Sequence, residues 1–266
     1  MELIIRPTAE HAARLCARLV ADRLRAKPDL VLGCATGRTM ERIYAELVRA
    51  HEAGGLDFSG CRTFNLDEYV GLSPEDPRSY HAYMLERLFR RVNLSPRNTF
   101  LPSGTAPDLA AEARRYEAQI AELGGIDLQL LGLGKTGHIG FNEPLSSLRS
   151  RTREKVLTPT TREQNAAFFG SPERVPERAL TMGVGTILDA REVVLVVTGG
   201  GKADVLARAT EGPITAMISA TALQLHPNCK VIADEAAAER LSGREYYRWL
   251  FEHEPEWEPY RRDPAL

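Results

Sequence analysis

Short apolar runs alternate along the chain with longer segments in which apolar residues recur every three or four positions. The runs have the composition of buried strands, and the longer segments have the periodicity of amphipathic helices. The predicted strands span residues 3–5, 29–33, 62–66, 126–131, 193–197 and 230–234, and the predicted helices span residues 10–27, 40–52, 79–90, 108–123 and 235–252. This alternation is typical of an α/β fold with an open, mostly parallel sheet covered by helices on both faces.

Nothing in the pattern marks a second domain, so residues 1–252 are predicted to form a single domain. Residues 253–266 are charged and contain prolines, which predicts a poorly ordered tail. Residues 146–162 are rich in hydroxyl and basic side chains, as in a solvated surface or an anion site. Phe168 and Phe169, with a glycine and prolines nearby, predict either a mobile lid segment or a small hydrophobic cluster.

The chain has 266 residues, of which 43% are hydrophobic and 26% charged, and a formal net charge of -2. This balance gives no reason to expect a nucleic-acid or membrane-surface partner. The N-terminus lacks the features of a signal peptide, and no apolar run approaches the roughly 18 residues of a membrane span, so we expect a cytoplasmic protein. The scattered cysteines predict packing thiols and neither a metal site nor disulfides: Cys16, Cys34, Cys61 and Cys229.

Two loops join a predicted strand to a predicted helix through small residues. The first contains Thr36, Gly37, Arg38 and Thr39, and the second runs through three glycines to Lys202. Such loops offer main-chain amides and the positive end of a helix dipole, which favour a phosphate group. The alternative for the first loop is a tight turn before an N-capped helix. The lysine of a P-loop is missing from it, so a nucleoside triphosphate is not expected.

Candidate acid and base residues follow two of the predicted strands. Asp67 and Glu68 come directly after the strand at residues 62–66, where carboxylates are suited to catalysis or to capping a helix or turn. His138 and Glu143 lie in a glycine-rich loop after the strand at residues 126–131. A turn there would place the carboxylate on one imidazole nitrogen and leave the other for proton transfer. The alternative is a structural histidine in a glycine turn.

Together these loops resemble those of the glucosamine-6-phosphate deaminase family. The matching motifs are Thr36-Gly37 with Thr39, NLDEYVGL at residues 65–72, GHIGFNEP at 137–144, SRTR at 150–153, TMGVGT at 181–186 and LQLHP at 223–227. They occur in the order found in the family and cover nearly the whole chain. The resemblance implies a Rossmann-like fold and an enzyme that converts glucosamine 6-phosphate and water to fructose 6-phosphate and ammonia.

The resemblance also implies a role for each candidate residue. His138 would move the proton that opens the sugar ring, and Glu143 would orient it. Asp67 would take the proton from C2 of the open chain and return it at C1. The phosphate would be held by the loop at residues 36–39 and by Lys202. No metal ion or organic cofactor is implied.

Three positions depart from the pattern of the family. Thr136 stands where an acidic residue often belongs to the ring-opening group, so it is included among the catalytic candidates. Ala167 stands where better-known members carry a phosphate-binding arginine within the lid. Arg38 stands where a small residue is common, and we hypothesise that it replaces the missing lid arginine.

Some members of the family are hexamers activated by N-acetylglucosamine 6-phosphate at a subunit interface. The resemblance therefore allows a homo-oligomer with an effector site at Ser146, Arg153 and Lys155, although these basic residues also suit a plain surface. Two other enzymes remain as alternatives, a galactosamine-6-phosphate deaminase and a 6-phosphogluconolactonase-like hydrolase. A non-catalytic sugar-phosphate sensor is a further alternative, disfavoured by the absence of a DNA-binding segment in the sequence.

Overall fold

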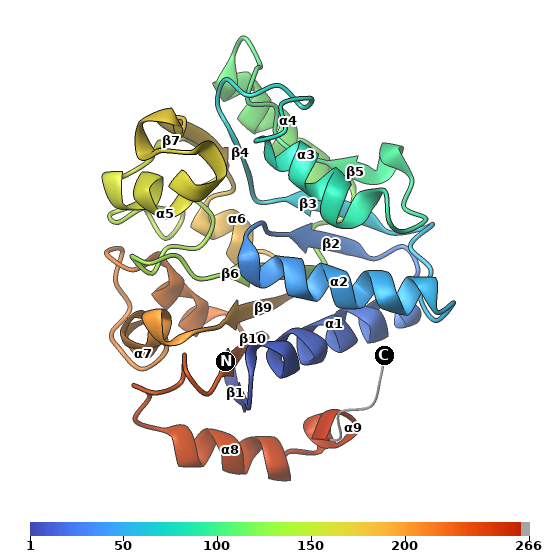
Figure 1. Cartoon of the computed structure of the whole chain (residues 1–266), viewed down its shortest axis with the longest axis vertical. Coiled ribbons are helices and arrows are strands. Elements are labelled where there is room, and N and C mark those ends of the chain that lie inside the picture. The colour runs from blue at the N-terminus through green and yellow to red at the C-terminus, as the bar shows by residue number, and fades with distance from the viewer. Residues whose placement is uncertain (262–266) are drawn as a thin grey trace.

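The computed structural model describes residues 1–261 and places a seven-stranded parallel sheet at the centre of the molecule (Figure 1). The strand order is β1-β10-β9-β6-β2-β3-β5, and every pairing is parallel. Its strands are β1 (Glu2–Arg6), β2 (Val31–Cys34), β3 (Arg62–Asn65), β5 (Thr99–Phe100), β6 (Leu128–Gly132), β9 (Glu192–Val197) and β10 (Cys229–Asp234). The predicted α/β class and mostly parallel sheet are confirmed.

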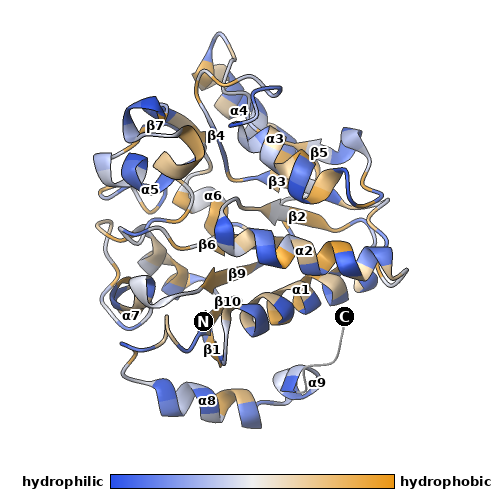
Figure 2. Ribbon diagram, in the orientation of Figure 1, coloured by the Kyte–Doolittle hydropathy of each residue, from blue (hydrophilic) through white to orange (hydrophobic). Residues whose placement is uncertain are grey.

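Helices flank the sheet, and α1 and α2 lie side by side against it (Figure 1). The helices are α1 (Ala9–Ala26), α2 (Arg38–Glu52), α3 (Tyr80–Met84), α4 (Leu109–Glu122), α5 (Pro159–Phe169), α6 (Val184–Leu188), α7 (Ala203–Thr210), α8 (Arg244–His253) and α9 (Glu258–Arg261). Hydrophobic and hydrophilic bands alternate along α1 and α2 (Figure 2). This is the amphipathic pattern from which both helices were predicted.

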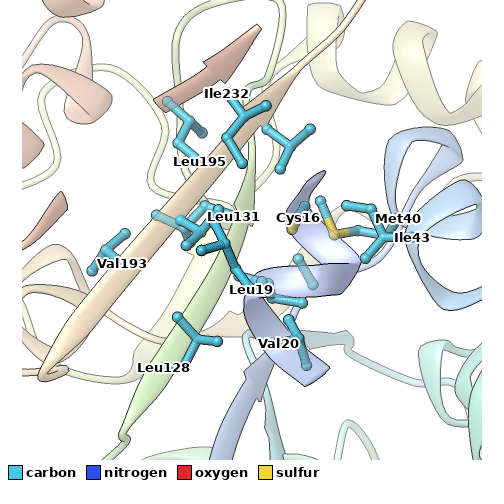
Figure 3. Close-up of a cluster of buried hydrophobic side chains, with 14 of the residues drawn as sticks. Cys16, Leu19, Val20, Met40, Ile43, Leu128, Leu131, Val193, Leu195 and Ile232 are labelled. Atoms are coloured by element: carbon cyan, nitrogen blue, oxygen red, sulfur yellow. The ribbon is translucent and has the colours of Figure 1, made fainter. Parts of the chain in front are cut away.

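The largest core lies between these two helices and the central strands (Figure 3). All six residues of β9 are buried, because helices cover the sheet on both of its faces. Side chains of both helices and of the sheet meet in this core: Cys16, Leu19 and Val20 of α1, Met40 and Ile43 of α2, and Leu131, Leu195 and Ile232 of the sheet. The four cysteines are free and buried, as the prediction of packing thiols requires.

A second, three-stranded antiparallel sheet was not predicted. It has the order β4-β8-β7 and consists of β4 (Asp67–Tyr69), β8 (Arg178–Thr181) and β7 (Arg153–Val156). The region at residues 146–162, interpreted as a polar surface segment or an anion site, therefore contains a strand. The polar and partly exposed side chains of β7 gave no alternation by which to detect it.

The region around Phe168 and Phe169 is also more regular than predicted. Both residues end α5, whose N-terminus is capped by the Thr158 hydroxyl group and whose C-terminus is followed by left-handed Gly170 at φ 85°. Phe169 is buried in a small hydrophobic cluster with Tyr69 and Phe141, whereas Phe168 is exposed. The alternative of a hydrophobic cluster therefore holds for Phe169.

The C-terminal prediction was wrong in two respects. The predicted helix at residues 235–252 begins later, at Arg244 of α8. The predicted tail is packed on the domain as far as it is described, because Trp257 is 1% exposed and donates to Glu2 Oε2 at 2.8 Å. Lys230 adds an ion pair to Glu256 at 3.0 Å. These contacts hold the segment against the edge strand β1, and residues 262–266 lie outside the described part.

Candidate active site

A pocket of about 690 Å³ opens at the carboxyl ends of the central strands. Ligands bind at this edge of open parallel sheets, where neighbouring strands lead to loops that diverge. In this sheet the divergence lies between β6 and β2, because the chain passes from β6 to β9 on one side and from β2 to β3 on the other. Seven of the predicted site residues line the pocket: Thr36, Gly37, Arg38, Thr39, Asp67, His138 and Lys202.

Asp67 lies at the start of β4 and is 5% exposed. Burial, together with the nearby charge of Glu68, raises the pKa of the Asp67 carboxyl group to about 8. Asp67 pairs across the antiparallel sheet with Thr181, and the Thr181 hydroxyl oxygen accepts the main-chain N–H of Phe141 at 3.0 Å. This contact holds the loop that carries His138 against β8, which is the neighbour of the strand that carries Asp67.

Glu68 points away from the pocket and binds main-chain amides instead. It accepts the N–H groups of Tyr69, Tyr80 and His81 at 2.8, 3.0 and 2.9 Å. Tyr80 and His81 are the first residues of α3, so the carboxylate satisfies the N-terminus of that helix. The two acids therefore divide the roles that were predicted for the pair: Asp67 faces the pocket and Glu68 caps a helix.

His138 is buried at the edge of the pocket and is held through its Nδ1 atom. Nδ1 lies 2.8 Å from Thr136 Oγ1 and 3.5 Å from Glu143 Oε2. A carboxylate facing Nδ1 favours the tautomer with the proton on that atom, which leaves the lone pair of Nε2 free to accept a proton. Gly134 makes room for the ring, because a Cβ atom there would lie 2.1 Å from Nε2.

Glu143 does not line the pocket and acts on His138 from behind. Its Oε1 atom accepts the main-chain N–H and the hydroxyl group of Thr158 at 3.1 and 3.2 Å. Burial by itself would raise the pKa of Glu143, but the interactions with His138, Thr161 and Thr158 lower it. The ionised carboxylate can therefore orient the imidazole and stabilise its protonated form. Thr136 does not line the pocket either, and its contact with the site is the one between its hydroxyl group and Nδ1 of His138.

The loop at residues 36–39 has the geometry of an anion cradle. Gly37 adopts φ 106°, and the internal hydrogen bonds of α2 begin with Met40 and Glu41, which donate to Gly37 O. The amides of Arg38 and Thr39 precede these bonds at the positive end of a 15-residue helix. Thr39 Oγ1 lies 3.4 Å from Thr198 Oγ1, which brings the second glycine loop beside the first.

Lys202 enters the pocket from that second loop. The carboxylate of Asp234 accepts the N–H of Gly199 at 3.0 Å and fixes the loop at the end of β9. Burial, and to a lesser degree the positive charge of Lys135, lowers the pKa of the Lys202 ammonium group to about 8. An ammonium group in such surroundings is stabilised by a bound anion.

Arg38 lies near Ala167, the position that departs from the pattern of the family. Both residues line a smaller cavity of about 300 Å³, together with Glu41, Arg42 and Phe168. The residues that α5 contributes to the main pocket are uncharged: Gln164, Asn165, Phe168 and Phe169. Helix α5 therefore brings no positive charge to the main pocket, whereas α2 brings Arg38 and Arg42.

The three residues of the predicted effector site lie outside the pocket. Arg153 donates from Nη1 to Asn142 Oδ1 at 2.8 Å, and burial lowers the pKa of its guanidinium group. Ser146 is buried two residues after Pro144, and Lys155 follows Arg153 on β7. No metal-binding cluster of three His, Cys, Asp or Glu side chains occurs within residues 1–261, and no helix there could span a membrane.

Several residues of the pocket were missed by the sequence analysis. Tyr80 and Tyr83 reach it from the helical region after β4, and Tyr83 donates to Gly37 O at 3.0 Å. Lys135 reaches it from the loop of His138. The tyrosines carried no local signal, because their approach depends on how distant segments fold together. Lys135 could have been found, since it lies three residues before the predicted catalytic histidine.

Residues 6–231 match the model of the family described as glucosamine-6-phosphate isomerases/6-phosphogluconolactonase. The chain belongs to this family. It is 49% identical over 250 residues to a glucosamine-6-phosphate deaminase of Hahella chejuensis, covering 94% of this chain and 95% of the relative. It is 52% identical over 244 residues to that of Rhodopirellula baltica, covering 92% and 97%.

Solved structures of the family have the same fold. A monomeric glucosamine-6-phosphate deaminase has a TM-score of 0.89 and 45% identity, covering 90% of this chain and 100% of that one. A 6-phosphogluconolactonase from Trypanosoma cruzi has a TM-score of 0.73 and 21% identity, covering 91% and 97%. The second likeness shows the fold alone. Among these family members, the similarity to the deaminases is therefore much stronger.

Proposed function

We propose that this protein is a glucosamine-6-phosphate deaminase of amino-sugar metabolism, which converts glucosamine 6-phosphate and water to fructose 6-phosphate and ammonia. The observation that carries the proposal is the meeting of Asp67 and His138 in one pocket that also holds Lys202 and an anion cradle. Isomerisation of a sugar phosphate needs a group that can donate and accept a proton, a carboxyl group and a site for the phosphate. Relatives 49 and 52% identical carry the name of this activity.

The phosphate group anchors the substrate. It carries about -1.5 to -2 charges at neutral pH and accepts several hydrogen bonds. The amides of Arg38 and Thr39, the hydroxyl groups of Thr36 and Thr39, and the ammonium group of Lys202 meet these requirements from fixed parts of the sheet edge. Binding of the anion favours the charged form of Lys202.

His138 opens the sugar ring. Its Nε2 atom takes the proton of the anomeric hydroxyl group and delivers a proton to the ring oxygen, so the imidazole regains its starting form. Glu143 stabilises the imidazolium through Nδ1 at 3.5 Å. Thr136 is a hydrogen-bond partner of Nδ1 at 2.8 Å and supplies no charge, so the stabilising charge comes from Glu143.

Asp67 then isomerises the open chain. The carboxylate removes the proton from C2, and the ammonium group passes a proton to O1, which gives an enolamine. Asp67 then delivers its proton to C1, and the enolamine becomes a protonated imine at C2. Water adds to this imine, and ammonia leaves to give the ketone of fructose 6-phosphate. The substrate ammonium group lowers the pKa of Asp67 when it binds, because an adjacent positive charge favours the ionised carboxylate.

The direct test follows ammonia and fructose 6-phosphate together after glucosamine 6-phosphate is added to the purified protein. We expect equal amounts of both products. Galactosamine 6-phosphate and 6-phosphogluconolactone are assayed in parallel. If the galactosamine epimer or the lactone is turned over faster, that compound is the substrate and the proposal is wrong. If none of the three is turned over, the protein is better explained as a sensor.

Arg38 supplies the phosphate contact that a lid arginine makes in better-known members. Arg38→Gln is expected to raise the KM for glucosamine 6-phosphate about 10-fold with little change in kcat, because it removes one charged hydrogen bond. Steady-state kinetics at fixed ionic strength measure this effect. The control is Arg97→Gln, which removes an exposed charge that does not line the pocket. A KM within about twofold of that of the parent would contradict the role of Arg38.

Regulation and assembly are proposed from the same resemblance. If Ser146, Arg153 and Lys155 bind N-acetylglucosamine 6-phosphate in an oligomer, substrate saturation is sigmoidal and becomes hyperbolic when this effector is added. Size-exclusion chromatography with light scattering measures the oligomeric state of the same preparation. A monomer whose kinetics are hyperbolic and do not change when the effector is added would show that these residues bind no effector, in line with the monomeric deaminase of known structure.

A further inference from the structure

The cations of the pocket fall into two groups. Three arginines that line it have carboxylate partners: Arg42 with Glu10 at 3.4 Å, Arg78 with Asp76 at 2.6 Å and Arg87 with Glu41 at 3.8 Å. Three other cations in the lining have no carboxylate partner among residues 1–261: Arg38, Lys135 and Lys202. Unpaired positive charges gathered in one concave site indicate an anionic ligand. The proposed phosphate site uses Arg38 and Lys202, and Lys135 remains without a role.

Lys135 has a defined place in the pocket. Its main-chain N–H donates to Gln164 Oε1 at 3.0 Å, which ties the loop of His138 to α5. Its side chain is exposed at the mouth, and its charge lowers the pKa of Lys202. Two like charges that act on one another are jointly stabilised when a single dianion binds near both.

The position of Lys135 also suits the shape of a hexose 6-phosphate. The ring oxygen of the sugar is separated from phosphorus by three atoms, C5, C6 and O6. A loop that brings His138 to the ring oxygen can therefore bring a residue three positions earlier to the phosphate. The acid-base residue and a phosphate contact would then move as parts of one loop.

We propose that Lys135 is a second cationic contact for the phosphate group, acting from the loop that carries His138. This inference rests on the proposed function, because it names a further ligand for the same substrate. It makes the alignment of His138 depend on the presence of phosphate. Unphosphorylated amino sugars would lose both the anchor and this alignment.

The test measures binding separately from turnover. Dissociation constants for fructose 6-phosphate and for inorganic phosphate are determined by calorimetry for the parent, Lys135→Gln, Lys135→Arg and the charge control Arg97→Gln. Because Lys135 is partly solvated, we expect Lys135→Gln to weaken both ligands about 5- to 10-fold. Lys135→Arg and Arg97→Gln should stay within about twofold of the parent.

Proton uptake is a second readout, and it tests whether the charge of Lys135 acts on Lys202 in the folded pocket. The measurement is made in the Asp67→Asn protein, because the pKa of Asp67 in the same pocket is also about 8. At pH 8 this protein should take up protons on binding phosphate, because Lys202 has a pKa of about 8 in the free protein and a bound anion favours its charged form. Without the charge of Lys135, the pKa of free Lys202 is higher and the uptake is smaller. Calorimetry in buffers of different ionisation enthalpy measures the difference.

Each outcome decides a separate question. If Lys135→Gln binds both ligands within about twofold of the parent, the inference is overturned even where deaminase activity is present. If it weakens both ligands while no amino-sugar phosphate is turned over, Lys135 is a phosphate ligand and the proposed reaction is wrong. Equal weakening by Arg97→Gln would show a general charge effect and also overturn the inference.

Discussion

Asp67→Asn is expected to lower kcat for glucosamine 6-phosphate by about 10³-fold, because the amide cannot accept the proton of C2. The substituted side chain has nearly the same shape, so the dissociation constant for fructose 6-phosphate should stay within about threefold of that of the parent. Single-turnover kinetics and calorimetry measure the two quantities. Turnover within about tenfold of the parent would show that another group is the base.

The same substitution should stabilise the folded protein at neutral pH. The pKa of Asp67 is raised from 3.8 to about 8, so between these values the folded protein holds a proton that the unfolded chain releases. The free energy of unfolding therefore falls as pH rises through this window, by at most about 6 kcal/mol. Asn has no such ionisation. The gain in Tm of Asp67→Asn over the parent should be absent near pH 4 and largest near pH 8, and a variant destabilised at pH 8 would contradict the assigned burial of the charge.

His138→Gln is expected to lower kcat by about 10²- to 10⁴-fold, because ring opening loses its proton carrier. This loss should depend on the ring form of the substrate. Fructose 6-phosphate has a small open-chain fraction, on which Asp67 can act without His138. With an ammonium salt present to form the imine at C2, exchange of the C1 proton of fructose 6-phosphate with deuterated water should therefore be impaired at least about tenfold less than deamination.

Asp67→Asn is the matched comparison, since it should abolish exchange and deamination alike. Glu143→Gln should produce a smaller loss than His138→Gln, because it removes the charge behind the imidazole and leaves Nε2 in the pocket. An equal loss of exchange and deamination in His138→Gln would contradict a role confined to ring opening. Nuclear magnetic resonance follows the exchange, and ammonia release follows the deamination.

Much of this fold was predictable from local patterns. The run at β9 is apolar at nearly every position and forms a fully buried strand, and the periodic apolar residues of α1 and α2 form the helices that cover the sheet. The loops with catalytic and phosphate-binding candidates follow predicted strands. In a parallel sheet, the carboxyl ends of such strands share one edge, so the meeting of Asp67 and His138 in one pocket follows from the fold class.

Other features were beyond local patterns. The sequence offered two adjacent acids after β3 and no means to separate them, because the difference lies in the amides of Tyr80 and His81, which bind Glu68. The burial that raises the pKa of Asp67 depends likewise on the second sheet. Its strands β4, β8 and β7 are short and come together from distant parts of the chain.

The C-terminal segment and the cations of the pocket also show the difference between what local sequence indicates and what the fold decides. Residues 253–266 have a tail-like composition, yet Trp257 is buried and bonds to Glu2, which is 255 positions away. Arg38 and Lys135 were visible in the sequence as single cations near glycines, and the pocket shows that they converge with Lys202. Periodicity in the sequence shows which face of a helix or strand is buried, because the residues on one face recur at a fixed spacing along the chain. Partners, pKa values and convergent charge depend on contacts between remote segments, and these exist only in the folded protein.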